Sequence, residues 1–288
     1  KVGEVKFIDV VSTVMGRRME QDARIFCMGE DIHRLKGGTN GATRGLAARF
    51  PERIVPTPIA EQGFAGLAGG VAMEGTYRPV VEFMYPDFAL VAADQIFNQI
   101  AKARHMFGGE TRMPIVVRTK CGIGTGYGSQ HSMDPAGLYA MWPGWRIVAP
   151  STPFDYVGLM NSALLCEDPV LMIEHVALYN SSGLGPLEDF DYCIPLGKAR
   201  VVRAGSVFTV LTYSAMTPLA VSRPSATPPE KRSPGCAVPE CARRCWPTSA
   251  RRNRSRRLSC CALSVNGEIA RPRTFWCRTP APIPSRCA

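Results

Sequence analysis

The alternation of short apolar runs with longer helical patterns, between Val2 and about Leu219, is the feature that most constrains the fold. Several of the short runs are continuously apolar, as expected of strands that are buried on both faces of a sheet. Strands that alternate with helices are typical of α/β proteins with a mainly parallel sheet, so we predict an α/β fold. The expected strands are residues 25–28, 54–56, 79–84, 115–118, 146–149 and 170–174.

The clearest helical pattern runs from Asp87, the predicted N-cap, to about His105, with apolar residues at every third or fourth position. We interpret this stripe as a surface that faces the core. A second helix is expected after Glu61, and it carries four glycines within residues 63–70. Glycine lowers helix propensity, so this pattern indicates close packing against another helix, of this chain or of another subunit.

The charge of the chain is divided between a neutral body and a basic tail. Residues 1–220 carry 20 Lys and Arg against 21 Asp and Glu, whereas residues 221–288 carry 14 against 3, with 7 of the 11 cysteines. The tail has no sustained helical or strand period. We therefore expect a main domain in residues 1–190, the start of a second domain in residues 191–220, with a strand-like run from Val207, and a disordered Arg-, Pro- and Cys-rich tail in residues 221–288.

Three interpretations compete for this tail. The arginine run at residues 251–257 would suit a nucleic-acid-binding arm. The cysteines between residues 236 and 261 would suit a zinc module, but their spacing has no Cys-x2-Cys pair and the tail has no His. A shifted reading frame in a G+C-rich gene would produce this composition directly, and we favour it. The coding DNA after codon 220, read in the neighbouring frames, tests it.

Neither a membrane span nor a secretion signal is predicted. The mean hydropathy is −0.03, and no apolar run approaches the roughly 20 residues that a membrane helix needs. Residues 1–19 contain no apolar stretch of signal-peptide length. We therefore expect a cytoplasmic protein.

The candidate functional residues follow the expected strands. Glu30 and Asp31 come directly after the first strand, Glu61 lies between the second strand and its helix, and His131 follows a glycine loop at residues 122–128. Parallel sheets bind ligands at the carboxyl ends of their strands. The alternatives stay open, because acids are favoured at helix N-termini and a single His is often structural. The glycine loop lacks the features of a nucleotide motif, so we interpret it as a loop whose backbone lies close to a ligand.

Five motifs together resemble the β subunit of the E1 component of 2-oxo acid dehydrogenases, which are the thiamine diphosphate enzymes of the pyruvate, branched-chain and acetoin dehydrogenase complexes. The resemblance covers about three quarters of the chain. It implies a transketolase-type pyrimidine-binding domain followed by a truncated second α/β domain. The motifs are FCMGED at 26–31, TPIAEQGFAG at 57–66, RPVVEFM at 78–84, DQIFNQ at 94–99 and QHS at 130–132.

The resemblance also implies roles for single residues. Glu61 matches the glutamate that hydrogen-bonds the aminopyrimidine ring of thiamine diphosphate and promotes its imino tautomer. Glu30 matches an acid near the cofactor, and Phe88 an aromatic residue that packs on the pyrimidine. His131 matches a histidine at the entrance that assists acyl transfer to the lipoyl group. A structural potassium ion is implied as well, and Cys166 stands in its site where an acid is common. The potassium ligands would come from Ile115, Ala163, Leu164, Cys166 and Asp168.

The resemblance further implies partners. The chain lacks the Gly-Asp-Gly motif with a downstream Asn that holds Mg²⁺ and the diphosphate, which in the family belongs to the α subunit. We therefore expect an α2β2 heterotetramer that decarboxylates a 2-oxo acid, with pyruvate favoured, and transfers the acyl group to a lipoyl-E2 acyltransferase. The alternative is an inactive chain that binds the α subunit without catalysis. Binding of nucleic acid through the basic tail is the third interpretation.

Overall fold

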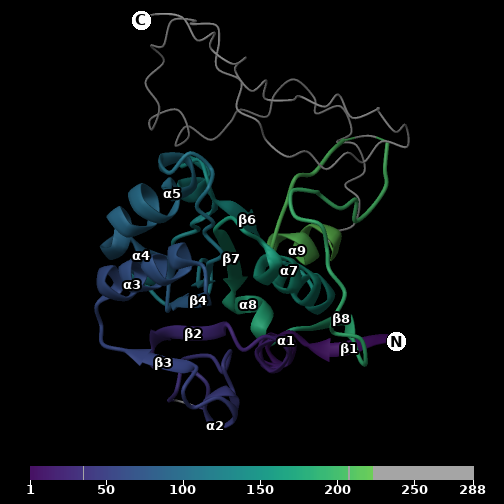
Figure 1. Ribbon diagram of the computed structural model, residues 1–288. Coiled ribbons are helices and arrows are strands. Elements are labelled where there is room, and N and C mark those ends of the chain that lie inside the picture. Colours follow the sequence, from purple (N-terminus) through teal and green to yellow (C-terminus); the bar gives the residue numbers. More distant parts are fainter. Residues whose placement is uncertain (35, 207, 223–288) are drawn as a thin grey trace, which may run out of the picture.

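A six-stranded parallel sheet forms the centre of the protein (Figure 1). The computed structural model describes residues 1–34, 36–206 and 208–222. The strand order is β3-β2-β4-β5-β7-β6, and all neighbouring strands are parallel. The predicted α/β fold is confirmed, and every predicted strand is present with its ends shifted by at most three residues. The strands are β2 (Ile25–Glu30), β3 (Ile54–Thr57), β4 (Arg78–Phe83), β5 (Val116–Cys121), β6 (Arg146–Val148) and β7 (Val170–His175).

Helices cover both faces of this sheet. In Figure 1, helices α3 and α4 lie to the left of the sheet and helices α1 and α7 to the right. Alternate residues of the strands enter two separate apolar cores, because successive side chains of a strand point to opposite faces. The helices are α1 (Phe7–Gln21), α2 (Leu46–Arg49), α3 (Glu61–Glu74), α4 (Pro86–Ala89), α5 (Ala103–Met106), α6 (Ala136–Ala140), α7 (Pro153–Leu165), α8 (Val176–Tyr179) and α9 (Met216–Ser222).

The helix predicted to begin at Asp87 is divided into shorter pieces. Tyr85 is its N-cap, and Pro86 takes the first helical position, where its missing N–H costs no hydrogen bond. Between α4 and α5 lie a 3₁₀ turn and a π-helical segment at Asp94–Ile100. The predicted apolar stripe faces the core through most of its length, although Phe107 at its end is exposed. The period of apolar residues thus indicated the buried face but not the type of helix.

The glycines of α3 divide between two environments. A Cβ on Gly69 would lie 3.0 Å from Ile100, so this part of the helix packs closely on the π-helical segment of the same chain. A Cβ on Gly70 would meet no atom within 4 Å, and Gly63 is nearly as open. The predicted close packing is therefore present within the chain at Gly69, while one face of α3 is uncovered.

The segments outside the central sheet were predicted less well. Strands β1 (Val2–Lys6) and β8 (Ser182–Pro186) form a small antiparallel sheet that was not predicted. Residues 208–213, expected as part of a strand, belong to none of the strands of the described chain. The tail from residue 223 onward, with its arginine run and its cysteines, lies outside the described residues, and the boundaries at residues 190 and 220 stay predictions.

Four charged side chains are buried between the sheet and α7. Arg118 on β5 donates two hydrogen bonds to Glu174 on β7, of 2.7 and 2.8 Å, and one of 3.1 Å to Glu82 on β4. Lys120 Nζ lies 2.5 Å from the other oxygen of Glu82. All four side chains are at most 5% exposed. The two positive and two negative charges balance, as a buried ionic cluster requires.

Two tyrosines complete this cluster. Tyr156 of α7 donates a hydrogen bond of 2.7 Å to Glu174, and Tyr179 of α8 donates one to the other carboxylate oxygen. Burial raises the pKa of both phenols well above its ordinary value, so both remain donors. Burial alone would also raise the pKa of Glu82, but Lys120 and Arg118 outweigh it and hold that pKa low. The cluster therefore links three strands and two helices. Its carboxylates stay ionised and its two phenols stay neutral.

Replacing Arg118 should destabilise the protein strongly. Arg118→Leu would leave two buried carboxylates without their shared cation, and we expect the free energy of unfolding to fall by about 3–5 kcal/mol. Urea denaturation measures this change. Arg49→Leu, which removes the exposed ion pair with Glu20, is the matched control and should cost less than about 1 kcal/mol. Equal decreases in the free energy of unfolding of the two variants would show that the buried cluster stabilises the protein no more than an exposed ion pair does.

Candidate active site

The predicted functional residues gather at the carboxyl edge of the sheet. Glu30 ends β2, Glu61 begins the helix that follows β3, and Phe88 belongs to the helix that follows β4. The glycine loop follows β5 and ends in a 3₁₀ turn that contains His131. Four separate strand ends therefore contribute to one region, which is where parallel sheets bind ligands.

Glu61 and Glu30 form a pair of neighbouring carboxyls. Glu61 is the first residue of α3 and is only 6% exposed. Burial and the neighbouring Glu61 carboxylate raise the pKa of Glu30 to about 7, and Asp31 acts in the same direction. Glu30 is therefore protonated in about half of the molecules at neutral pH. A carboxyl group in this state can donate a hydrogen bond as well as accept one.

Two buried oxygen atoms beside this pair lack protein partners. Glu30 Oε1 and Thr57 Oγ1 are buried and make no hydrogen bond within the described chain. Glu30 and Thr57 are register partners at the ends of β2 and β3, so these oxygens belong to adjacent strand ends. Buried polar atoms are nearly always paired, so this corner of the site suits a ligand that offers hydrogen-bonding groups.

Aromatic rings surround His131. Its imidazole lies 4.4 Å from the ring of Tyr85 and 5.3 Å from that of Phe88, both edge to face, and 6.5 Å from the nearly parallel ring of Tyr127. Burial, together with the neighbouring Tyr127 hydroxyl, raises the pKa of Tyr85 to about 12, so Tyr85 stays neutral. The three rings therefore flank the imidazole at the carboxyl edge.

The glycine loop returns the chain from β5 to His131. Gly124, Gly126 and Gly128 all have positive φ, between 76° and 92°, which other residues rarely adopt. Thr125 N donates a hydrogen bond of 3.1 Å to the carbonyl of Gly122, so the loop closes on itself. A Cβ on Gly122 would overlap the carbonyl oxygen of His131 and lie 3.1 Å from Tyr85. Gly122 is therefore required for the position of His131.

Sequence reasoning missed several residues of this site. Lys120 on β5 donates a hydrogen bond of 2.8 Å to Thr39, which joins the loop before α2 to the sheet. Its positive charge also opposes the rise in the pKa of Glu30. Thr57, Tyr85 and Tyr127 were likewise not identified as parts of the site. The signal available for Lys120 was a charged residue near the end of an expected buried strand.

The residues predicted to bind potassium lie together around the end of α7. Arg78 donates hydrogen bonds of 3.1 and 3.2 Å to the carbonyls of Leu164 and Cys166. The carbonyl of Ile115 accepts from Val170, that of Ala163 accepts from Cys166, and the carboxylate of Asp168 binds Arg104 and Arg146. In this arrangement Arg78 supplies a positive charge to the segment. Potassium binding by these residues stays a prediction.

Gly122→Ala should disturb His131. We expect the overlap with the His131 carbonyl to lower the free energy of unfolding by about 1–3 kcal/mol and to shift the NMR signals of the imidazole. Gly137→Ala in α6 is the control, because a Cβ there meets nothing within 4 Å, and alanine in a helix is neutral or mildly stabilising. An unchanged His131 signal in Gly122→Ala would show that Gly122 is not required for the position of His131.

The raised pKa of Glu30 predicts a pH dependence of stability. The native pKa of about 7 exceeds the ordinary value of about 4.3, so between these values the native state binds more protons than the unfolded state. The stabilisation is complete below about pH 4.3 and is lost as the pH rises through about 7. Glu30→Gln cannot ionise, so its melting temperature relative to the wild type should rise between about pH 5 and pH 8. A constant difference would contradict the prediction.

Comparison with known proteins places this chain in a family. The family described as transketolase, pyrimidine binding domain, matches residues 4–182. The 2-oxoisovalerate dehydrogenase subunit beta of Bacillus subtilis is 41% identical over 210 residues, which are 73% of this chain and 63% of that protein. Pyruvate dehydrogenase E1 component subunit beta-1, mitochondrial, of Arabidopsis thaliana is 37% identical over 221 residues, covering 76% and 60%.

A solved structure shows the same fold. It is described as a split gene transketolase, inactive beta4 tetramer, with a TM-score of 0.59 and 19% identity over 76% of this chain and 66% of that one. The chain spans slightly less than two thirds of the length of the relatives named above. The parallel sheet, the carboxyl-edge site and these matches agree: the chain belongs to the transketolase pyrimidine-binding domain family, and its relatives include the E1 β subunits of 2-oxo acid dehydrogenases.

Proposed function

We propose that this chain is the β subunit of a thiamine diphosphate-dependent 2-oxo acid dehydrogenase E1, active together with an α subunit. The observation that carries the proposal is the buried Glu61 at the start of α3, beside Glu30 and the two unpaired oxygens of Glu30 and Thr57. An aminopyrimidine ring carries both donors and acceptors of hydrogen bonds. The carboxyls of Glu61 and Glu30 and the hydroxyl of Thr57 offer matching acceptors and donors, so these residues fit the pyrimidine half of thiamine diphosphate.

The chain's own residues have distinct tasks in this proposal. When bound, thiamine diphosphate supplies a carbanion and an electron sink for decarboxylation. Glu61 hydrogen-bonds the pyrimidine ring and orients it, and the burial of its carboxyl excludes competing water. Glu30, with its pKa of about 7, supplies or accepts a proton beside Glu61 without a large energetic cost. Phe88 packs on the ring, and His131 assists acyl transfer at the entrance.

The uncovered face of α3 supports assembly with a partner. Gly63 and Gly70 leave the helix backbone open on this face, and Leu67 and Met73 are exposed. Small residues between exposed apolar side chains allow another helix to approach closely. We assign this face to contact between subunits in an α2β2 heterotetramer, with the diphosphate and Mg²⁺ held by the α subunit. Lipoyl-E2 and a 2-oxo acid, with pyruvate favoured, complete the proposed partners.

The location of the protein remains a prediction. Within the described parts of the chain, no helix is both long enough and apolar enough to span a bilayer. We propose the cytoplasm, although the related Arabidopsis E1 β subunit is described as mitochondrial.

Co-expression with the α subunit of the same complex tests the function. We expect thiamine diphosphate to bind the complex, as measured by calorimetry, and a 2-oxo acid to be decarboxylated with an artificial electron acceptor. Glu61→Ala should lower this rate by about 10²–10⁴-fold, the usual contribution of a positioned acid or base. His131→Ala should keep the rate of decarboxylation with the artificial electron acceptor but lose acyl transfer to lipoyl-E2.

The controls separate this proposal from its alternative. Glu52→Ala, which removes an exposed carboxyl that precedes β3 and so lies at the end of that strand opposite Thr57 and Glu61, should leave the rate unchanged. Undiminished activity in Glu61→Ala would overturn the assignment of Glu61. A complex that forms with the α subunit but neither binds thiamine diphosphate nor decarboxylates would instead show an inactive, α-binding chain.

A further inference from the structure

The residues that follow His131 are tied to the site by hydrogen bonds. The N–H of His131 and the hydroxyl of Ser132 both donate to the carbonyl of Gly128, over 3.3 and 2.6 Å. The N–H of Met133 donates a bond of 3.3 Å to the carboxylate of Asp87 in α4. The glycine loop and α4 therefore hold the backbone around His131.

The next residue, Asp134, is bound from a distant part of the chain. Tyr213 Oη donates a hydrogen bond of 2.7 Å to Asp134 Oδ2, although the two residues are 79 positions apart. Asp134 Oδ1 accepts a bond of 2.9 Å from the N–H of Ala136. Both oxygens of the carboxylate are therefore engaged, one by its own loop and one by the start of the predicted second domain.

Tyr213 is itself held at the carboxyl end of the sheet. The N–H of Ser214 donates a bond of 3.3 Å to the carbonyl of Ala149, the residue after β6. Ser214 has a φ of 50°, which residues other than glycine adopt uncommonly, and the chain then continues into α9. Burial and the hydrogen bond to Asp134 raise the pKa of Tyr213 to about 12, so its hydroxyl remains a donor at neutral pH.

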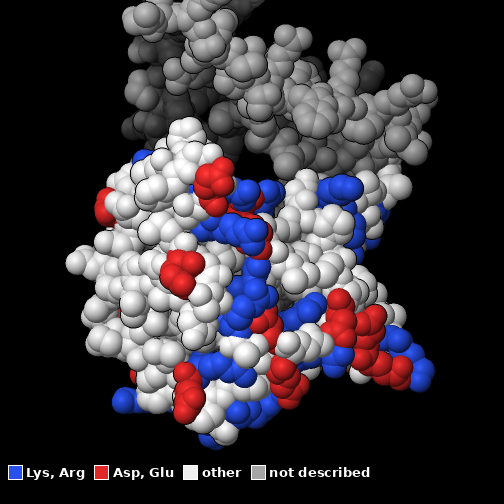
Figure 2. Space-filling model, viewed as in Figure 1, with Lys and Arg blue, Asp and Glu red and all other residues white. Residues whose placement is uncertain are grey.

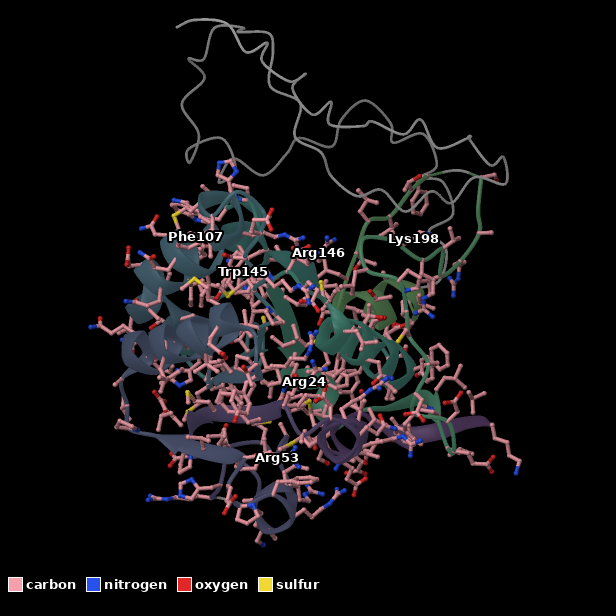
Figure 3. The ribbon with its side chains drawn as sticks, viewed as in Figure 1. Arg24, Arg53, Phe107, Trp145, Arg146 and Lys198 are labelled. Atoms are coloured by element: carbon pink, nitrogen blue, oxygen red, sulfur yellow. The ribbon has the colours of Figure 1, made fainter. Side chains whose placement is uncertain are left out.

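Cavities flank the segment that contains Tyr213, residues 208–217. One of about 670 Å³ separates it from the glycine loop, and another of about 720 Å³ lies beside β6, whose first residue Arg146 is labelled in Figure 3 together with Lys198 of the cavity lining. Among the described residues, the bond from Tyr213 to Asp134 is the one hydrogen bond between residues 208–222 and residues 122–136. Because a cavity separates the two sides, this bond rather than close packing sets the distance between them.

Asp134 is the one carboxylate in the lining of the first cavity. Acidic and basic side chains are interspersed over the face seen in Figure 2, whereas this lining is otherwise apolar or neutral. His175 belongs to the lining, but burial outweighs the attraction of Asp134 and lowers the pKa of its imidazole. A carboxylate with few polar neighbours depends on each hydrogen bond that it accepts. Without the Tyr213 hydroxyl, Asp134 and the loop that carries it would turn toward solvent.

We propose that Tyr213 is a positioning residue that acts through Asp134 on His131. The proposal rests on the function proposed for His131, acyl transfer at the entrance. A group that takes part in a transfer step must be placed closely, and a displacement of about 1 Å can lower the rate about a hundredfold. Residues 208–213 form no strand within the described chain, yet their segment supplies the hydroxyl that holds the loop of this imidazole.

NMR spectroscopy of the free full-length chain tests the placement directly. Tyr213→Phe removes the hydroxyl and keeps the ring. We expect the imidazole signal of His131 to shift and hydrogen exchange at residues 131–136 to become about 3–10-fold faster, as for the loss of a partly exposed hydrogen bond to a carboxylate. Asp134→Asn keeps an uncharged acceptor oxygen, so its effect should be smaller.

Tyr192→Phe is the matched control. It removes another phenol hydrogen bond, of 2.6 Å, to the carbonyl of Phe154 in α7, and it should change neither the His131 signal nor the exchange. Thermal unfolding checks that each variant is folded. A His131 signal that is the same in Tyr213→Phe and the wild type, or an equal shift in Tyr192→Phe, would overturn the proposal.

The complex with the α subunit tests the consequence for the reaction. Tyr213→Phe should keep the rate of decarboxylation with the artificial electron acceptor and lower kcat for acyl transfer to lipoyl-E2 by about 3–10-fold. In the His131→Ala background the same substitution should leave the residual transfer rate unchanged, because it acts through the imidazole.

Two outcomes of the assay would contradict the proposal. Equal decreases in both rates would show a general structural role for Tyr213, and a further equal decrease in the His131→Ala background would show that Tyr213 acts independently of the imidazole. If the wild-type complex transfers no acyl group, the function proposed for His131 fails, while the NMR comparison still decides whether Tyr213 positions it.

Discussion

The ion pairs of Arg118 with Glu82 and Glu174 are the interaction on which the rest of the structure depends. Charges buried this deeply are tolerated only when each has its partners, so the three strands must keep one register. Tyr156 and Tyr179 extend the same requirement to helices α7 and α8. The cluster lies on the face of the sheet opposite α3. Because it holds β4, β5 and β7 in register, it also sets the positions of the strands against which the helices of both faces pack.

The cluster also connects to the proposed active site. Lys120 shares Glu82 with Arg118 and binds Thr39, which brings the loop before α2 to the carboxyl edge. The charge of Lys120 limits how far burial and Glu61 raise the pKa of Glu30. The chemistry proposed for the carboxyl edge therefore depends on a buried cation as well as on the two carboxyls.

Much of the fold followed from local patterns. The short, largely apolar runs indicated the strands because a strand buried on both faces is mostly apolar, and Glu61 and His131 fell at the predicted edge. The buried charges on β4, β5 and β7 are the exceptions, and each has its partners in the ionic cluster. The division of the helix after Tyr85 was missed, since the apolar period marks a buried face but not the hydrogen-bond pattern of the backbone. The pairing of β1 with β8 was missed for another reason: about 180 residues separate the two strands.

The sequence by itself determined the order of strands and helices, the family, and the identity of Glu61, Glu30, Phe88 and His131 as candidates. Only the tertiary structure decided which side chains meet. The sheet order places β2 beside both β3 and β4, so Glu30 approaches Glu61 and Thr57, while the glycine loop returns His131 to Tyr85. Local patterns identify which residues form a strand. The neighbours of that strand in the sheet come from distant parts of the chain, so they are decided by tertiary packing.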